Sequence, residues 1–430
     1  MKIISHTDPD YTEFCQKLDR RAIPDTSVSA AVAEIIGEVR ERGTEAILDF
    51  TRKFDSVELT AETIRVSEAE LAEADALVTP ELRAAVAATR ENIHSYAQHS
   101  FKKAWTAENA QGAVYGERFH PYDRVGVYVP GGKAPLVSTA LMTAAFAQAA
   151  GVEEIVAVTP TSGPNKKVNP SLLYALKQAG ATEVYQVGGA HAVAMLALGT
   201  AEVPPVQKIF GPGNPFVVEA KRQLIGAVSI DLLPGPSEVL VVADDSANPR
   251  FVAADLLAQA EHGGDSVIAF FTPSLSLVEA VQEEIKLQAA KLSRGAEISR
   301  VLDEGTSVVI TKDLDEAIKL SNDFAAEHLT LIVEDEEAAL AKVRTSGAVY
   351  VGNFSPVAVG DFLAGPSHTL PTGGSAKSFS GLRADQFQRR MSIVRMDRSA
   401  VEESVAHTDA FAAVEGLDAH GRSVQIRLED

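Results

Sequence analysis

The chain has 430 residues, of which 39 are Lys or Arg and 59 are Asp or Glu, so its formal net charge at pH 7 is −20. This charge disfavours a nucleic-acid-binding protein, which needs a basic face to displace counterions. The single cysteine, Cys15, excludes an intrachain disulfide and a cysteine-based zinc or iron–sulfur site. The length exceeds what one hydrophobic core usually holds, so about two or three domains are expected.

No targeting segment is evident. Residues 1–6 turn polar too early for a signal peptide. The longest uncharged stretch, 134–152, carries Pro, Ser, Thr and Gln among its alanines. It is typical of a buried helix rather than of a membrane span, which wants about 20 strongly apolar residues. We therefore expect a cytoplasmic protein that binds neither nucleic acid nor membranes.

The first 120 residues are predicted to be mostly helical. An amphipathic run covers 28–52, and a second helix begins near Pro80, because proline is tolerated in the first turn of a helix. No Gly or Pro interrupts residues 81–111, so this helix is expected to be long, with Trp105 near its end.

At Arg124 short apolar runs begin to alternate with helical segments. This alternation is typical of parallel sheets covered by helices on both faces. The turn at 234–237 divides the region into two α/β units, about 124–236 and 237–352, and the helical N-terminal part is expected to pack on one of them. The predicted strands are 125–129, 155–158, 184–187, 208–210, 239–242, 268–271, 308–310, 329–333 and 349–351.

The last 80 residues lose the alternation. Residues 365–380 are rich in Gly, Ser and Pro and predict an ordered functional loop or a lid. Residues 399–430 predict a short helical segment and an extended tail, which either frays in solvent or reaches a partner subunit.

Gly-rich turns follow several strands of the first unit, at Gly131-Gly132, Gly188-Gly189 and Gly211-Pro212-Gly213-Asn214. Ligands of open α/β sheets bind outside the carboxyl ends of the strands, and glycine lets backbone N–H groups approach a phosphate. However, no G-x-G-x-x-G follows the first strand, and Thr159-Pro160-Thr161 rather than an acid ends the second. The turns fit a dinucleotide site and plain connections equally well.

Gln259 and His262 lie three residues apart at the end of a predicted helix and share a face. They are either half of a metal site or, for the His, a cap at the negative helix end. Glu327 and His328 form a possible acid/base pair if the backbone turns between helix and strand, since neighbours on a strand point opposite ways. Asp361 and His368 are turn residues by default.

Taken together, these segments resemble the histidinol dehydrogenase family. The matching segments are spread over residues 125–420 and are specific only in combination. They include VGVYVPGGKAPLVSTALMTAAFAQAAGV (125–152), VGGAHAVAMLALGT (187–200), KIFGPGNPFVVEAKRQ (208–223), GPSEVLVVAD (235–244), DLLAQAEHGGDS (255–266), NDFAAEHL (322–329), GDFLAGPSHTLPTGGSA (360–376) and EGLDAH (415–420).

The resemblance implies an α/β fold with two Rossmann-like parallel-sheet domains, a helical N-terminal region and small terminal segments. It assigns 24–124 and 237–382 to the first domain and 125–236 to the second. Residues 1–23 then form an N-terminal segment and 383–407 a small segment, and 408–430 form a C-terminal tail that reaches the partner of a homodimer.

The resemblance also implies the oxidation of L-histidinol to L-histidine through histidinal in two NAD-dependent steps, the last step of histidine biosynthesis. Glu327 and His328 would be the acid/base residues. The implied zinc ligands are Gln259, His262, Asp361 and His420. Substrate contacts would come from these four ligands and from Ser237, His328, His368 and Glu415, and NAD contacts from Tyr128, His191 and Asn214. Glu415 and His420 would come from the partner subunit.

Two features depart from the family pattern: His191, and an extra proline, where Ala is common, in the turn Pro234-Gly235-Pro236-Ser237. His191 stands where much of the family has Gln, which leaves the NAD role of this position open. Many enzymes that oxidise aldehydes use a catalytic Cys. Cys15 lies outside every matching segment, so a hydrated aldehyde handled by Glu327 is expected instead.

Three other functions stay open from the residues alone. They are a relative that oxidises a different alcohol such as a sulfonated diol, a zinc hydrolase with the same four ligands, and a non-catalytic metabolite-binding protein. NADH formation with histidinol separates the first two from a histidinol dehydrogenase, and growth rescue of a histidine auxotroph excludes the third.

Overall fold

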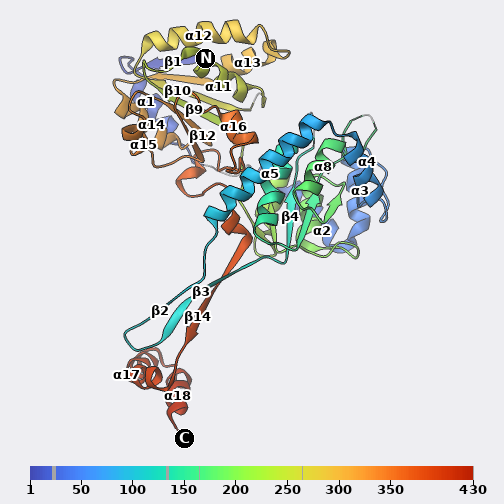
Figure 1. Cartoon of the computed structure of the whole chain (residues 1–430), viewed down its shortest axis with the longest axis vertical. Helices are drawn as coiled ribbons and strands as arrows, with labels where there is room; N and C mark the ends of the chain where they lie inside the picture. The colour runs from blue at the N-terminus through green and yellow to red at the C-terminus, as the bar shows by residue number, and fades with distance from the viewer. Residues whose placement is uncertain (22–25, 132–134, 164, 264, 430) are drawn as a thin grey trace.

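The computed structural model describes residues 1–21, 26–131, 135–163, 165–263 and 265–429. Figure 1 shows two α/β units and a long β-ribbon that carries the C-terminal helices away from them. Gly132, which belongs to one of the predicted glycine turns, lies outside the described residues. The prediction of an α/β fold with two parallel-sheet units is confirmed.

The six-stranded unit, uppermost in Figure 1, is built on a parallel sheet in the order β1-β11-β10-β9-β12-β13. Strand β9 is buried at every position, as expected for a central parallel strand. The strands are β1 (Lys2–Ser5), β9 (Glu238–Ala243), β10 (Val267–Thr272), β11 (Thr306–Ile310), β12 (His328–Ile332) and β13 (Ala348–Val351). One face is covered by α11 (Pro249–Ala260), α12 (Leu275–Ala289) and α13 (Gly295–Gly305), the other by α1 (Tyr11–Leu18), α14 (Leu314–Phe324) and α15 (Glu336–Leu340).

The five-stranded unit has a parallel sheet in the order β6-β5-β4-β7-β8. Its strands are β4 (Arg124–Tyr128), β5 (Glu154–Val158), β6 (Glu183–Tyr185), β7 (Lys208–Phe210) and β8 (Ser229–Ile230). One face packs on α4 (Glu68–Leu77), α5 (Pro80–Ser100), α6 (Val137–Ala140), a π-helical turn (Leu141–Ala145), α7 (Phe146–Ala149) and α8 (Pro170–Gln178). The other packs on α2 (Ser29–Arg42), α3 (Thr44–Asp55), α9 (Gly189–Leu198) and α10 (Pro215–Leu224).

The structure corrects the placement of the N-terminal helices. Helices α2 to α5 pack on the five-stranded unit, whereas the sequence analysis grouped 24–124 with 237–382. The physical reason is that α9 is apolar over nearly its whole surface, and the apolar faces of α2 and α3, including Val32 and Ile47, cover it. Conversely, the N-terminal segment adds the edge strand β1 to the six-stranded sheet.

A three-stranded antiparallel ribbon, β14-β3-β2, projects from the body and leads to the C-terminal helices (Figure 1). It consists of β2 (Trp105–Glu108), β3 (Val114–Pro121) and β14 (Gln388–Arg395), and it is followed by α17 (Arg398–Glu415) and α18 (Asp418–Gln425). The long helix predicted through 111 is therefore wrong beyond Ser100, because pairing with β3 turns the segment around Trp105 into a strand. We call residues 398–429 the tail; it is helical rather than extended.

The two units meet along the chain that follows α16 (Val357–Phe362). The carbonyl oxygens of Phe362 and Leu363 accept hydrogen bonds from Thr89 Oγ1 and Asn92 Nδ2 of α5, both at 2.8 Å. Ser367 Oγ donates to the carbonyl of Met142 at 2.9 Å. The predicted loop at 365–380 is therefore ordered, and it fastens one unit to the other beside the candidate site.

Candidate active site

Glu327 and His328 stand at the start of β12, at the amino edge of the six-stranded sheet. Helix α14 ends in Ala325, whose φ of 52° is left-handed, so the backbone turns sharply before the strand begins. Both side chains are buried, with 7% of Glu327 and 3% of His328 exposed. This location departs from the rule that ligands of such sheets bind at the carboxyl edge.

The Glu327 carboxylate is held by the neighbouring strand β9. Its Oε2 atom accepts hydrogen bonds from Ser237 Oγ and from the backbone N–H of Glu238, both at 2.8 Å. Burial raises the pKa of Glu327 to about 7, although His328 and these two donors pull it down. A carboxyl group that gains and loses a proton near neutral pH is suited to general acid/base chemistry.

The imidazole of His328 has a fixed orientation. Its Nδ1 lies 2.8 Å from the carbonyl oxygen of Glu238, which can only accept, so Nδ1 carries the proton and donates. Its Nε2 lies 3.3 Å from Asp361 Oδ1. Burial alone would lower the pKa of His328, but the carboxylates of Glu327 and Asp361 outweigh it and hold that pKa above its ordinary value. In the neutral ring, Nε2 is the nitrogen that can take up a proton.

The structure brings Asp361 beside His328 and leaves several polar atoms there without a protein partner. Asp361 Oδ1, His328 Nε2 and Gln259 Nε2 are buried without a hydrogen bond of normal geometry. Burial would raise the pKa of Asp361, but His328 and the nearby His368 and His262 hold it below its usual value. Buried polar atoms without partners are costly, so they mark a place where a ligand completes the structure.

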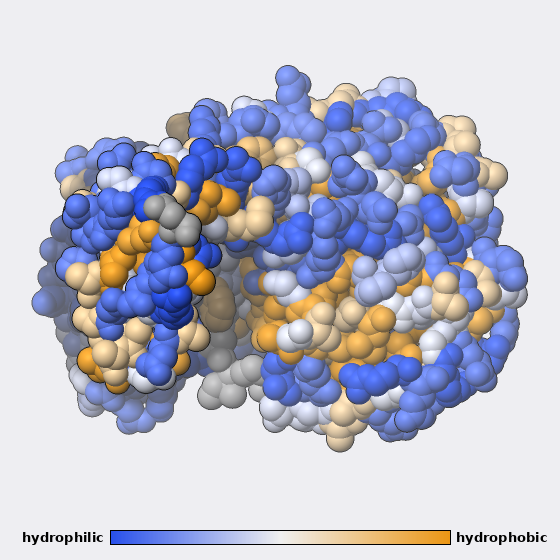
Figure 2. Space-filling model, turned by 90° about the horizontal axis from the view of Figure 1, so that it is seen from below, coloured by the Kyte–Doolittle hydropathy of each residue, from blue (hydrophilic) through white to orange (hydrophobic). Residues whose placement is uncertain are grey.

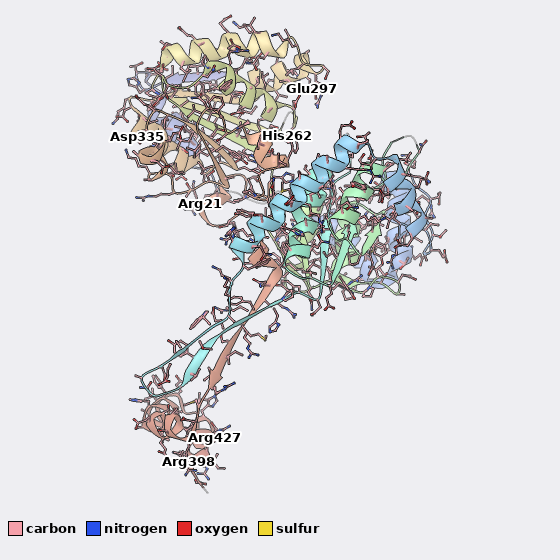
Figure 3. All side chains as sticks on the ribbon, in the orientation of Figure 1. Arg21, His262, Glu297, Asp335, Arg398 and Arg427 are labelled. Atoms are coloured by element: carbon pink, nitrogen blue, oxygen red, sulfur yellow. The ribbon has the colours of Figure 1, made fainter. Side chains whose placement is uncertain are left out.

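Gln259 and His262 come from the end of α11, as the sequence analysis placed them. Gln259 is buried, and His262 remains open to solvent on the side of the six-stranded unit that faces the other unit (Figure 3). Protein atoms that desolvate the ring lower the pKa of His262, which keeps its imidazole neutral at pH 7. Asp361 is close enough to influence that pKa, so the three groups share one region.

His368 joins this region to the five-stranded unit. Its Nδ1 lies 3.0 Å from the backbone carbonyl oxygen of Asp361, and its Nε2 lies 3.2 Å from Thr139 Oγ1 of α6. Because α6 follows β4, Thr139 lies at the carboxyl edge of the five-stranded sheet. The amino edge of one sheet therefore faces the carboxyl edge of the other across His368.

The three predicted NAD-binding residues lie along the carboxyl edge of the five-stranded sheet. Tyr128 ends β4, and its hydroxyl accepts a hydrogen bond from the backbone N–H of Gly189 at 3.0 Å. Burial raises the pKa of Tyr128 to about 12, so it stays protonated. Asn214 is exposed and caps α10, accepting from the backbone N–H of Val217 at 3.1 Å.

His191 is buried among side chains of the protein rather than exposed at the surface, where it could contact a ligand freely. It is 1% exposed, and the rings of Phe50 and Phe54 of α3 lie 5.8 and 6.1 Å from it. Burial lowers the pKa of His191 to about 3, so its ring is neutral. Thr51 Oγ1 gives its proton to the carbonyl of Ile47, so it accepts from His191 Nε2 at 3.3 Å. His191 Nδ1 is left as a buried acceptor without a partner.

Glu415 and His420 do not reach the other predicted site residues within one chain. Both lie exposed on the tail, at the far end of the ribbon from the body (Figures 1 and 3, where Arg398 and Arg427 mark the tail). Among the described residues, no three His, Cys, Asp or Glu side chains gather as a metal site. This agrees with a ligand set that has only two such residues, His262 and Asp361, in the body of one chain.

Sequence reasoning missed a buried ion pair that supports the site. Arg20 donates to both carboxylate oxygens of Glu238, at 2.7 and 3.1 Å, and its guanidinium stacks on Phe324. Glu238 Oε1 also accepts from the backbone N–H of Gly373. The backbone of Glu238 in turn holds both Glu327 and His328. An acid at the start of an otherwise apolar strand was the available signal.

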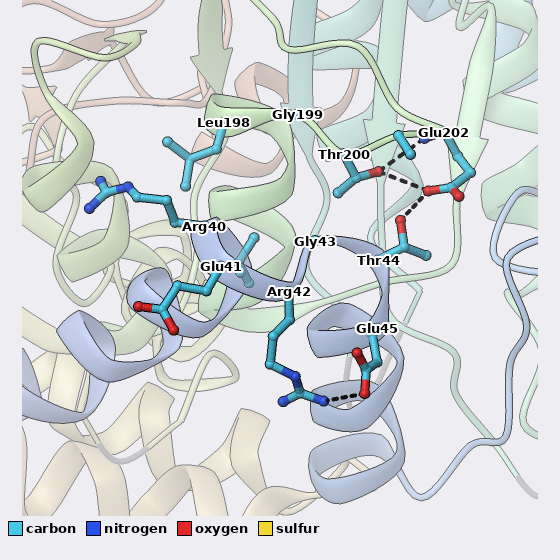
Figure 4. A pocket seen from close by; sticks show the side chains of 12 residues that line it. Arg40, Glu41, Arg42, Gly43, Thr44, Glu45, Leu198, Gly199, Thr200 and Glu202 are labelled. Atoms are coloured by element: carbon cyan, nitrogen blue, oxygen red, sulfur yellow. Dashed lines mark hydrogen bonds and ion pairs between the residues drawn. The ribbon is translucent and has the colours of Figure 1, made fainter.

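A surface cavity of about 550 Å³ lies elsewhere, between the α2–α3 turn and the end of α9 (Figure 4). Glu202 accepts hydrogen bonds there from Thr44 and Thr200. Since α9 runs from the carboxyl edge of the sheet to its amino edge, this cavity lies opposite the predicted cofactor residues. None of the predicted site residues lines it, so we assign it no part in the function.

In the described parts of the chain, no helix is long and apolar enough to cross a membrane. A buried carboxyl–imidazole pair that faces the carboxyl edge of a Rossmann-like sheet is the arrangement of a two-domain α/β oxidoreductase. The family model for histidinol dehydrogenase matches residues 18–428, and the chain belongs to this family. The family catalyses the NAD-dependent last step of histidine biosynthesis.

Similar proteins match over the whole length. The histidinol dehydrogenase of Heliobacterium mobile is 40% identical over 429 residues, covering 100% of both chains. That of a Synechococcus strain is 42% identical over 431 residues, covering 100% of this chain and 99% of the relative. The crystal structure of histidinol dehydrogenase from Elizabethkingia anophelis is 33% identical with a TM-score of 0.94, covering 100% of this chain and 98% of that one.

Proposed function

We propose that this chain oxidises L-histidinol through L-histidinal to L-histidine in the cytoplasm, with zinc and NAD as cofactors and with active sites shared between two subunits. The overall change converts one alcohol, one water and two NAD⁺ into one carboxylate, two NADH and three protons. The observation that carries the proposal is the buried Glu327–His328 pair beside the unpartnered atoms of Asp361 and Gln259.

The residues present fit a zinc ion. Neutral imidazole nitrogen and carboxylate or amide oxygen are ligands that zinc accepts when cysteine is absent. His262, Asp361 and Gln259 supply three of them, and the carboxylate oxygen Oδ1 of Asp361 is buried without a hydrogen bond. We propose His420 of the partner subunit as the fourth. When bound, zinc supplies positive charge that anchors the imidazole and amino alcohol of the substrate.

In its neutral form, His328 would take the alcohol proton at Nε2, because its Nδ1 proton is committed to the carbonyl of Glu238. Since Glu327 and Asp361 raise the pKa of His328, this neutral form becomes more populated as the pH rises. When bound at the carboxyl edge of the five-stranded sheet, NAD would supply the acceptor for the hydride that leaves the alcohol carbon. The histidinal must then be hydrated before a second hydride can leave. Glu327 would take a proton from that water, since burial gives its carboxyl a pKa near the working pH. Ser237 and the backbone of Glu238 keep the carboxylate in place during both steps.

The tail supports the proposed homodimer. Phe411 and Val414 of α17 are 70% and 88% exposed, and Figure 2, which looks at the tail end-on, shows apolar groups on its surface. Exposed apolar side chains on the tail are typical of a protein–protein interface, which would bury them against a partner subunit. Glu415, which is next to Val414, would then pair with the substrate ammonium in the other subunit's site, and His368 would line the same site.

NADH formation with L-histidinol as the sole alcohol tests the proposed function. We expect two NADH for each histidine produced. Absence of turnover with histidinol in the presence of zinc and NAD, together with failure to rescue a histidine auxotroph, would overturn it.

A further inference from the structure

One buried carboxylate near the cofactor edge has no part in the chemistry described above. Asp55 is the last residue of α3. Its Oδ2 atom is buried and has no hydrogen-bond partner. Burial raises the pKa of this carboxyl, and the nearby Lys166 only partly offsets the effect. A buried acceptor of this kind is costly unless a donor from outside the chain satisfies it.

Three observations place Asp55 at the carboxyl edge of the five-stranded sheet. The Lys166 ammonium, on the loop that follows β5, donates to the backbone carbonyl of Asp55 at 3.1 Å. The preceding residue, Phe54, lies against His191 near the start of α9. The charge of Asp55 also reaches the phenol of Tyr128 at the end of β4, whose pKa it raises.

The strand order of the five-stranded sheet is that of a nucleotide-binding sheet, in which an acidic residue at this edge has a known role. In chain order the strands β4 to β8 are arranged 3-2-1-4-5, the order of a doubly wound nucleotide-binding sheet. In such sheets an acidic residue near the end of the second strand accepts hydrogen bonds from the adenosine ribose. Here the second strand, β5, runs into Thr159-Pro160-Thr161 and supplies no acid.

We propose that Asp55, delivered by α3 from outside the βα alternation, binds the adenosine ribose of the dinucleotide and sets a preference for NAD over NADP. The inference rests on the proposed NAD dependence and goes further by naming the residue that selects the cofactor. The ribose 2′-hydroxyl offers the donor that the carboxylate lacks. A 2′-phosphate would bring negative charge against it, whereas Lys166 alone would tolerate that phosphate.

The test compares Asp55→Asn with Glu58→Gln, a nearby exposed carboxylate that pairs with Arg52 on the surface. For Asp55→Asn we expect KM for NAD to rise about 10- to 100-fold, with little change in kcat or in KM for histidinol. The ratio of kcat/KM for NAD over NADP should fall by a similar factor. The control variant should keep both values. An unchanged KM for NAD, or equal losses with NAD and NADP, would overturn the proposal.

A second measurement needs no variant and covers the case in which Asp55→Asn fails to fold. Wild-type protein should bind NAD more tightly than NAD that lacks the adenosine 2′-hydroxyl, by about the same factor. Equal binding of the two dinucleotides would refute the role of Asp55. Because binding is measured without histidinol, failure of the proposed oxidation and failure of this proposal give different results.

Discussion

Glu327→Gln tests the division of labour between the two oxidation steps. Glutamine keeps the shape of the side chain, and its amide oxygen can accept the two 2.8 Å hydrogen bonds from Ser237 and Glu238. Burial raises the pKa of Glu327 from its ordinary value to about 7, so at neutral pH the buried carboxylate costs stability, and a neutral replacement should raise the free energy of unfolding by up to a few kcal/mol. The variant should therefore fold normally.

The kinetic effect should be large and confined to one step. Loss of a general base typically costs about 10²- to 10⁴-fold, which is about 2.7 to 5.5 kcal/mol of activation free energy. We expect this loss in NADH formation from L-histidinal and a smaller loss in formation of histidinal from L-histidinol. The wild-type rate with histidinal should fall as pH drops below about 7, because protonated Glu327 cannot accept a proton from water. The variant should lack this dependence.

The assay measures NADH release with each substrate across pH, with Glu334→Gln as control. Glu334 is an exposed carboxylate just beyond the other end of the same strand, and its replacement should leave both steps unchanged. If Glu327→Gln slowed both steps equally, or if the fall in rate below pH 7 persisted in the variant, the assignment of Glu327 to the water-activating step would be wrong.

Three further predictions concern stability and assembly. Burial raises the pKa of Asp255 to about 7, so between about pH 4 and pH 7 the folded state keeps a proton that the unfolded state has released. The free energy of unfolding should therefore fall as the pH rises through this range. In urea titrations, Asp255→Asn should remove this pH dependence and be more stable than the wild type by a few kcal/mol at pH 8. Lys221 and Asp231 form a fully buried ion pair, so Lys221→Met should lower the free energy of unfolding by about 3 to 5 kcal/mol, while an unchanged denaturation midpoint would contradict this. Co-expression of His420→Asn and Glu327→Gln chains should give mixed dimers with about half of wild-type activity, since one shared site is intact; no recovery would argue against shared sites.

Periodicity and turn residues were enough to predict the fold class. The apolar runs at Val125–Val129 and Val239–Val242 are the central strands of the two sheets, and their burial on both faces explains why they lack alternation. The same reasoning failed at residues 101–111. Nothing local forbids a helix there, and only pairing with β3, a contact made after the chain has turned back, makes the segment a strand.

The residues of the candidate site were nominated by the family resemblance and not by their spacing in the sequence. Gln259, Asp361 and His328 are far apart in the sequence, and only the resemblance united them. The structure brings Asp361 to His328 through α16 and the loop that follows it. Arg20 and Asp55 were missed because each is a single charged residue in a helical region of the sequence. Arg20, just after α1, meets Glu238 only when α1 packs on the six-stranded sheet, and Asp55 meets Lys166 only when α3 packs on the five-stranded unit.

The arrangement of the two sheets explains why the site lies at an amino edge. Apart from the two residues proposed to come from the partner's tail, the groups proposed to hold and deprotonate the substrate belong to the six-stranded unit, and those proposed to hold NAD belong to the five-stranded unit. Hydride transfer requires the two molecules to touch, so the substrate edge must face the carboxyl edge where a dinucleotide binds. His368 spans the two edges, with one ring nitrogen on the backbone of Asp361 and the other on Thr139. The hydrogen bonds from α5 to the carbonyl oxygens of Phe362 and Leu363 fix the position of one unit against the other beside His368. The geometry of hydride transfer is therefore set by the contact between the units and not by either sheet alone.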